Sequence, residues 1–367
     1  MLVLMTLTHM PTRFSDPAGQ PFGFVSAAEG FVFLSAFLAA YVGTGRVQSS
    51  GVSGMRQWLR HRLAAVYACH VGLLAFLFLV AVPIGAARGE AAITNLASHF
   101  LRWPAWATAQ SLALVYNPPL LDILPMYIVF LVMTPAVLVL ARRRGWTLIL
   151  AGSTSLWLLA QVGTGQMLFD VLAYFVGYAY PYNQTGSFSF LAWQFLWVLG
   201  LWMGHAFATK PVESHRPPPW VGLIALAYVA VCFVWRHTTG QVPEPNGGEI
   251  NVLFDKWTLG PMRVLDFLSM AVALLAFAPR NAHTLAPAWL EWLGRAALPA
   301  FCAHLIVCLA ALAFFGSADA TRPVWIDVAL LGAGFAAMFF AAGLAASVRS
   351  RAGSVRAKRT PSLHGAD

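Results

Sequence analysis

Long apolar runs, separated by short polar segments, dominate the chain. A membrane-spanning helix needs about 20 mostly apolar residues, and runs of about that length lie at 24–45, 63–84, 121–141, 146–162, 190–208, 220–236, 259–279, 296–316 and 324–346. A further apolar run, 1–10, rises only about 15 Å as a helix, which is half of the hydrocarbon thickness. The pattern predicts an all-α fold, a polytopic helical membrane bundle of about ten transmembrane helices. We expect the first helix to be truncated at the start of the chain.

The composition places the chain in the same class. Of its 367 residues, 59% are hydrophobic and 10% are charged, against about 25% charged in soluble domains. A formal charge of +9 can indicate nucleic-acid binding, but most of the 23 Lys and Arg residues share one side of the membrane if the N-terminus is cytoplasmic. We therefore predict that both termini are cytoplasmic, that the basic residues orient the helices in the lipid, and that no nucleic acid binds.

No linker or repeat divides the chain. We predict one transmembrane domain over 1–346 and a basic cytoplasmic tail over 347–367. Two predicted outer segments, 95–121 and 163–189, are too apolar for ordinary loops and are rich in Trp and Tyr. We expect them to be interfacial or re-entrant pieces that cover a cavity on the outer side.

Two ionisable residues in the first two apolar runs are the strongest candidates for chemistry. His9 lies at the end of the first run and Glu29 near the start of the second, with a short polar loop, 11–21, between them. A neutral imidazole can accept the proton of an attacking hydroxyl, and a carboxylate on its other nitrogen would fix its tautomer. We predict that His9 and Glu29 form a catalytic pair. The alternative is that Glu29 is protonated or caps a helix N-terminus, with His9 as an interfacial residue.

Two further clusters carry charge. Lys256 and Arg263, at the outer end of a predicted helix, would suit a carboxylate or a sugar-like acceptor, although Arg263 and Asp266 are three residues apart and could instead pair with each other. Arg62 and His70 enter the third helix from the cytoplasm, where they could hold a phosphate-bearing donor. The alternative for the basic residues there is that they only orient the helix.

The other polar residues within the runs are weaker candidates. They are Asp122 and Tyr127 at the outer start of the fourth helix, Gln194 in the sixth and His304 in the ninth. Each alone is more often part of a helix–helix hydrogen bond than a ligand. The sequence has no Gly-rich phosphate loop, no nucleophile elbow and no His or carboxylate set with metal-binding spacing. We predict no metal and no bound cofactor.

Several motifs together resemble one family. Residues 28–37 (AEGFVFLSAF) are close to the AExFVFLSG signature of the OpgC family, membrane proteins associated with succinylation of osmoregulated periplasmic glucans and similar in layout to the membrane-bound acyltransferase-3 superfamily. The likeness spans nearly the whole chain in order, through Arg62 with Tyr67 and His70, 122–127 (DILPMY), 192–196 (AWQFL) with Leu199 and Gly200, Lys256 with Arg263, and 293–301 (LGRAALPAF).

The chain departs from the family pattern in two places. Members open with an Asp…Arg-Gly segment before the histidine of the first helix, and that segment would lie upstream of Met1, which supports the expectation of a truncated start. The family's Ser-Gly is Ser35 followed by Ala36 here, at an expected contact between helices.

The resemblance implies a membrane-embedded O-acyltransferase of the bacterial inner membrane. It would move an acyl group, succinyl in the family, from a cytoplasmic acyl-CoA such as succinyl-CoA to a hydroxyl of a periplasmic glucan. His9 and Glu29 would be catalytic, and the substrate-binding residues would be Arg62, His70, Asp122, Tyr127, Gln194, Lys256 and Arg263. The alternatives are an acyltransferase for another envelope polysaccharide, a polytopic transporter, and a non-catalytic membrane partner of a glucan synthase.

Overall fold

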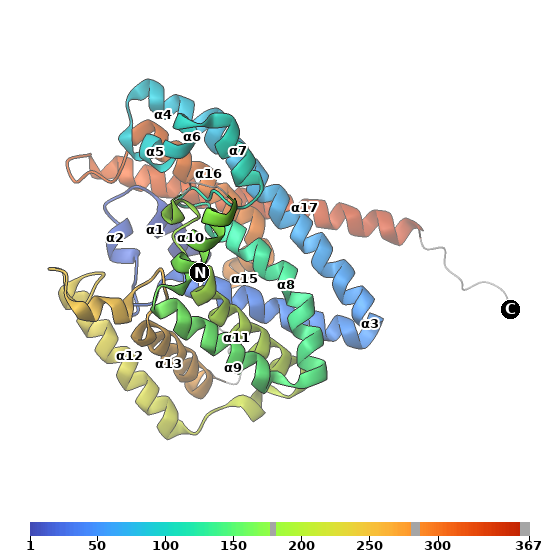
Figure 1. The fold of residues 1–367 in the computed structure, drawn as a ribbon. Helices are drawn as coiled ribbons and strands as arrows, with labels where there is room; N and C mark the ends of the chain where they lie inside the picture. Colours follow the sequence, from blue (N-terminus) through green and yellow to red (C-terminus); the bar gives the residue numbers. More distant parts are fainter. Residues whose placement is uncertain (177–180, 280–286, 360–367) are drawn as a thin grey trace.

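The computed structural model describes residues 1–176, 181–279 and 287–359. This part of the chain is folded into helices joined by turns and loops, and it contains no strand (Figure 1). Residues 177–180 of the predicted outer segment and 360–367 of the predicted basic tail lie outside the described residues. The all-α prediction is confirmed.

Among the described residues, six helices are long and apolar enough to cross a membrane. They are the continuous helix Ala27–Arg88, α8 (Ile123–Arg144), α11 (Phe190–Thr209), α12 (Pro219–Thr239), α16 (Ala297–Phe315) and the first part, Val324–Arg351, of α17 (Val324–Arg359). A seventh candidate is α9 (Trp146–Gln161) together with α10 (Thr164–Val176), which meet at a bend of 81°. The chain is therefore a multi-pass membrane protein.

The predicted count of about ten spans is not confirmed. The runs 24–45 and 63–84 belong to one helix, α3 (Ala27–Phe76), prolonged by η1 (Leu77–Ala81) and α4 (Val82–Arg88). The intervening segment contains no proline and remains helical, with a break only at Gly51, where φ is 68° and glycine is tolerated. Figure 1 shows the two arms of α3 meeting at an angle. The runs 1–10 and 259–279 form helices shorter than a span, α1 (Leu2–His9) and α13 (Pro261–Phe277).

Short helices fill the connections. They are α2 (Ser15–Ala18), α5 (Ala91–Leu96), α6 (Ser98–Arg102), α7 (Pro104–Leu112), η2 (Tyr182–Gln184), η3 (Val212–His215), η4 (Glu249–Phe254) and α15 (Ala288–Arg295). The two segments predicted to cover a cavity both border one of about 320 Å³, through Leu114 and Asn117 from the first and Phe169 and Tyr182 from the second. That they border a cavity is confirmed.

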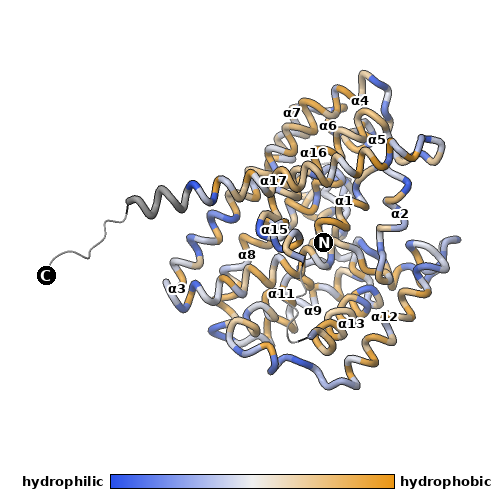
Figure 2. Tube along the Cα trace, turned by 180° about the vertical axis from the view of Figure 1, so that it is seen from behind, coloured by the Kyte–Doolittle hydropathy of each residue, from blue (hydrophilic) through white to orange (hydrophobic). Residues whose placement is uncertain are grey.

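The surface of the helices is apolar. Figure 2 shows hydrophobic positions along the long helices and hydrophilic positions gathered at turns and loops. Large apolar side chains are exposed on several of these helices, among them Leu79, Leu223 and Phe340. Exposure of this kind is expected where lipid, and not water, is the solvent around a helix.

Close packing of α3 on α11 forms the centre of the bundle. Gly200 and Gly204, four residues apart on α11, lie against the backbone of α3 at Phe33 and Phe37, with no room for a side chain. Small residues with this spacing allow two membrane helices to approach closely. Ala36 lies in the same contact, beside Gly200, so the expected helix–helix contact at this position is confirmed.

A buried carboxylate at the start of α17 holds the loop that follows α1. Asp327 is fully buried, accepts a hydrogen bond from Arg13 Nε at 2.8 Å, and lies 2.6 Å from Nη2 of Arg322. Arg322 also donates to the carbonyl oxygen of Pro11. The carboxylate thus fixes the chain directly after His9.

Replacing Asp327 with asparagine is expected to destabilise the protein, because the amide removes the buried carboxylate that forms ion pairs with two arginines. Breaking a buried ion pair costs about 3 kcal/mol or more, so the unfolding temperature in detergent should fall by several degrees. The matched control is Asp319→Asn, since Asp319 is exposed and accepts hydrogen bonds from Thr321. Equal unfolding temperatures for the two variants would contradict this role of Asp327.

Candidate functional site

A polar cavity of about 340 Å³ lies at the end of the bundle where α1 ends and where α3 and α8 begin. Loop residues before α11 and α13 complete its wall. Its polar lining residues are Thr8, His9, Ser15, Asp16, Gln20, Ser26, Asp122, Ser187, Gln241 and Lys256. Three residues predicted to act on substrate from the same side of the membrane, His9, Asp122 and Lys256, therefore share one cavity.

His9 is the last residue of α1, which ends before Pro11. Its Nδ1 lies 3.2 Å from Nε2 of His304 on α16, and the two rings stack with centroids 5.4 Å apart. The Cys308 thiol, one turn further along α16, donates to the backbone carbonyl of His9 at 2.7 Å. Both the ring and the backbone of His9 are thus held by α16.

The predicted contact between Glu29 and His9 is absent from the described residues. Glu29 lies at the third position of α3, where the amide groups of a helix N-terminus lack partners within the helix. One of its carboxylate oxygens accepts from the backbone nitrogen and the hydroxyl of Ser26, at 3.0 and 2.6 Å. The other accepts from Arg263 Nε. The alternative that Glu29 caps a helix N-terminus is confirmed.

Arg263 forms its ion pair with Glu29. The alternative ion pair, between Arg263 and Asp266, is not observed among the described residues. Both members of the Glu29–Arg263 ion pair are almost fully buried. Asp266, also buried, accepts a hydrogen bond at 2.9 Å from the backbone nitrogen of Phe24. The Glu29–Arg263 ion pair therefore joins α3 to α13 beside the cavity.

Lys256 and Asp122 line the cavity from different loops. The Lys256 ammonium lies 4.8 Å from the ring centroid of Trp257 and 5.9 Å from that of Phe188, and it forms no ion pair with any described residue. Burial lowers its pKa, against the opposing effect of the Glu29 and Asp122 carboxylates. A bound anion would therefore favour the charged ammonium.

The Asp122 carboxylate is buried and accepts from the backbone nitrogen of Ser187 at 3.0 Å. Burial raises its pKa, and hydrogen bonds from Ser187 oppose the shift. Asp122 also lines the neighbouring cavity of about 320 Å³. It thus stands between the two cavities.

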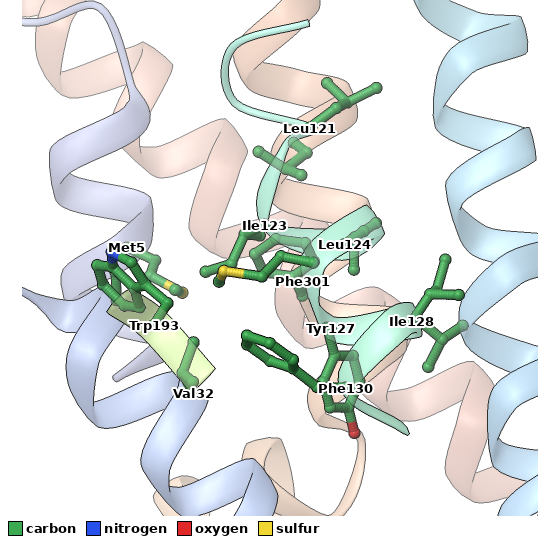
Figure 3. Close-up of a cluster of buried hydrophobic side chains, with 14 of the residues drawn as sticks. Met5, Val32, Leu121, Ile123, Leu124, Tyr127, Ile128, Phe130, Trp193 and Phe301 are labelled. Carbon is green, nitrogen blue, oxygen red and sulfur yellow. The ribbon is translucent and has the colours of Figure 1, made fainter. Parts of the chain in front are cut away.

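An apolar cluster, part of which Figure 3 shows, reaches the wall of the polar cavity. Met5 and Ile123 belong both to the cavity wall and to this cluster, which continues along α8 to Tyr127. The Tyr127 hydroxyl accepts from Arg62 Nε at 2.7 Å. Arg62 therefore lies against the first turns of α8, and it is not among the residues that line the polar cavity.

Two other predicted binding residues lie outside the polar cavity. His70 is fully buried and its Nε2 lies 3.2 Å from the carbonyl oxygen of Ser111, just before the end of α7. His70 is thus covered by α7, and its predicted role in binding the donor stays a prediction. Gln194 exchanges two hydrogen bonds with Ser153 of α9, at 2.7 and 2.8 Å, which confirms the alternative of a helix–helix contact.

Sequence reasoning missed the pairing of His304 with His9. His304 was noted as a polar residue within an apolar run, and an ionisable group there indicates a functional role. Its partner lies 295 residues away, so no local spacing connects the two. No group of three His, Cys, Asp or Glu side chains in the described residues is arranged to hold a metal ion.

These features define a multi-pass helical membrane protein with a histidine in a polar cavity at one end of its bundle. The model of a family described as OpgC protein matches residues 1–350, and the chain belongs to the OpgC family. No curated protein and no solved structure matches it.

Proposed function

We propose that the protein is an O-acyltransferase of the bacterial inner membrane. In this proposal it transfers an acyl group, most simply succinyl, from cytoplasmic acyl-CoA to a hydroxyl of a periplasmic glucan. The observation that carries the proposal is the His9 imidazole in a polar cavity among apolar helices. Membership of the OpgC family supports the reaction class.

The chemistry needs one base and one cavity. The glucan hydroxyl attacks the thioester carbonyl carbon while its proton passes to His9, and the carbon–sulfur bond then breaks. The imidazolium returns the proton to the departing thiolate, which leaves as the free thiol. A cavity of about 340 Å³ is large enough for a sugar unit and the acyl group.

Lys256 is proposed to bind the free carboxylate of a dicarboxylic acyl group. Arg263 is occupied by Glu29, whereas the Lys256 ammonium faces the cavity without an ion-pair partner among the described residues. Asp122 is proposed to accept a hydrogen bond from a sugar hydroxyl. Arg62 and Tyr127, which are hydrogen-bonded to each other, are proposed as contacts for the donor as it enters from the cytoplasm.

Replacing Lys256 with glutamine is expected to change acyl selectivity. A hydrogen bond to a charged group is worth about 1.5–3 kcal/mol, so kcat/KM for a succinyl donor should fall by roughly 10- to 100-fold. The same constant for an acetyl donor should change little, and Lys256→Arg should retain succinyl transfer. The measurement is transfer from each thioester in isolated membranes. An equal loss with both donors would remove Lys256 from the acyl-binding role.

The overall reaction is tested in a host that lacks its own glucan acyltransferase. Expression of the chain should add the mass of a succinyl group and one negative charge to periplasmic glucans. Unmodified glucans, with normal amounts of the protein in the membrane, would reject the glucan as acceptor. Profiling all envelope polysaccharides of the same cells then shows whether another glycan receives the acyl group.

A further inference from the structure

The surroundings of His304 favour one direction for its hydrogen bond with His9. The Nδ1 of His304 is buried and makes no hydrogen bond with any described residue, while the carbonyl groups of Ala300 and Phe301, one turn earlier on α16, lie near the ring. Because Nε2 faces His9, Nδ1 is the nitrogen left on the side of its own helix, where carbonyl oxygens, which only accept hydrogen bonds, favour a proton on Nδ1 of His304. In a neutral imidazole the other nitrogen, Nε2, is then an acceptor.

The acceptor nitrogen of His304 determines where the proton of His9 resides. Nε2 of His304 lies 3.2 Å from Nδ1 of His9, and a hydrogen bond between them requires the proton on Nδ1 of His9. The Nε2 of His9 then has a free lone pair. No described residue makes a hydrogen bond to this atom, and His9 lines the polar cavity.

The position of α1 on α16 supports the same arrangement. Cys308 donates to the His9 backbone carbonyl, and Met10 packs with Cys308 in a small buried cluster. The end of α1 is therefore fixed on the helix face that carries His304. A rotation of the His9 ring would break the contact between the rings without any compensating partner.

We infer that His304 is a positioning residue for His9, holding the tautomer in which Nε2 accepts the substrate proton. This inference rests on the proposed function and assigns to a neutral imidazole the role that the sequence had assigned to Glu29. As the reaction proceeds, His9 becomes an imidazolium whose Nδ1–H donates more strongly to His304. His304 itself exchanges no proton with the substrate.

Several charged groups lie near His9, but among the described residues the direct side-chain partner of its ring is His304. The ionisable groups on the elements packed against α1, or across the cavity from it, are Asp16 on α2, Glu29 on α3 paired with Arg263, Asp327 on α17 paired with Arg13 and Arg322, and Asp122 and Lys256 on the cavity wall. None of them makes a hydrogen bond or ion pair with the His9 ring in the described residues.

The test compares three variants in membranes across the pH range in which imidazole titrates. In His304→Leu, kcat/KM for acyl transfer should fall about tenfold or more, and the acid limb of the pH–rate profile should move to lower pH. His304→Gln should keep most of the rate, because its amide oxygen can accept from His9. Cys308→Ala, which removes a contact with the His9 backbone and leaves the ring contact in place, should keep the wild-type pH profile.

A second measurement does not depend on activity. Nitrogen NMR of the histidine-labelled protein, with the His9 signal assigned by its loss in His9→Gln, should show the proton on Nδ1 in the wild type and a mixture of tautomers in His304→Leu. A wild-type tautomer and pH profile in His304→Leu would overturn the inference and leave the acyltransferase proposal intact. Absence of acyl transfer by the wild type would reject the proposed function, while the NMR result would still decide the tautomer.

Discussion

Replacing His9 with alanine is expected to abolish acyl transfer while the protein still inserts and folds. A positioned general base contributes about 10²–10⁴-fold to a rate, and among the described residues that line the cavity His9 is the one histidine. His9 is only partly buried, and its ring contact is with His304 at the cavity wall, so its loss is expected to leave the helices in place. The measurement is the acyl content of glucans at equal amounts of protein in the membrane.

The matched control for this variant is Thr8→Ala. Thr8 precedes His9 on α1 and lines the same cavity, but its hydroxyl donates to the carbonyl of Met5 within the helix. We expect Thr8→Ala to retain nearly full transfer. Full transfer by His9→Ala would remove the base from the mechanism, and an equal loss in both variants would point to the structure of α1 instead.

The helices themselves were largely predictable, because the apolar runs identify them without reference to the rest of the chain. The errors arose where local composition is a poor guide to helix ends. Segment 46–62 is polar, yet it remains helical because it lacks proline and is broken only at Gly51. The run 259–279 contains a helix of 17 residues, because Pro261 marks the first helical position and the residues before it form a loop.

The sequence predicts which residues line the cavity better than it predicts which residues contact each other. His9, Asp122 and Lys256 share a cavity because they follow or precede apolar runs at the same end of the bundle, and that order can be read along the sequence. The partners of His9 and Glu29 could not be predicted in this way. Each lies more than 230 residues away, so the pairing depends on how helices pack and not on local spacing.

The position of Glu29 illustrates the same limit. A carboxylate at the third position after a serine is the sequence signature of a capping box, and this local feature was available as the alternative for Glu29. The choice between a cap and a catalytic carboxylate depended on Arg263, which is distant in sequence. Once the arginine is placed, the carboxylate has no free oxygen to orient His9.

Replacing Arg263 with leucine is expected to destabilise the protein severely, because Glu29 is left as a buried carboxylate without its counter-ion. Breaking a buried ion pair by removing one partner costs about 3–5 kcal/mol. Glu29→Gln should be similarly damaging, since the amide keeps an acceptor for Ser26 but leaves the guanidinium unpaired. The measurement is the unfolding temperature and the monodisperse fraction of the protein in detergent.

The double variant Glu29→Gln with Arg263→Leu separates this structural role from catalysis. Removal of both charges is often neutral or even stabilising, so the double variant should be more stable than either single variant, with a coupling of roughly 1–3 kcal/mol between the sites. Additive losses would contradict a direct ion pair. A Glu29→Gln protein of normal stability that transfers no acyl group would return Glu29 to the catalytic role, since only its chemistry and not its structural contact would then have been lost.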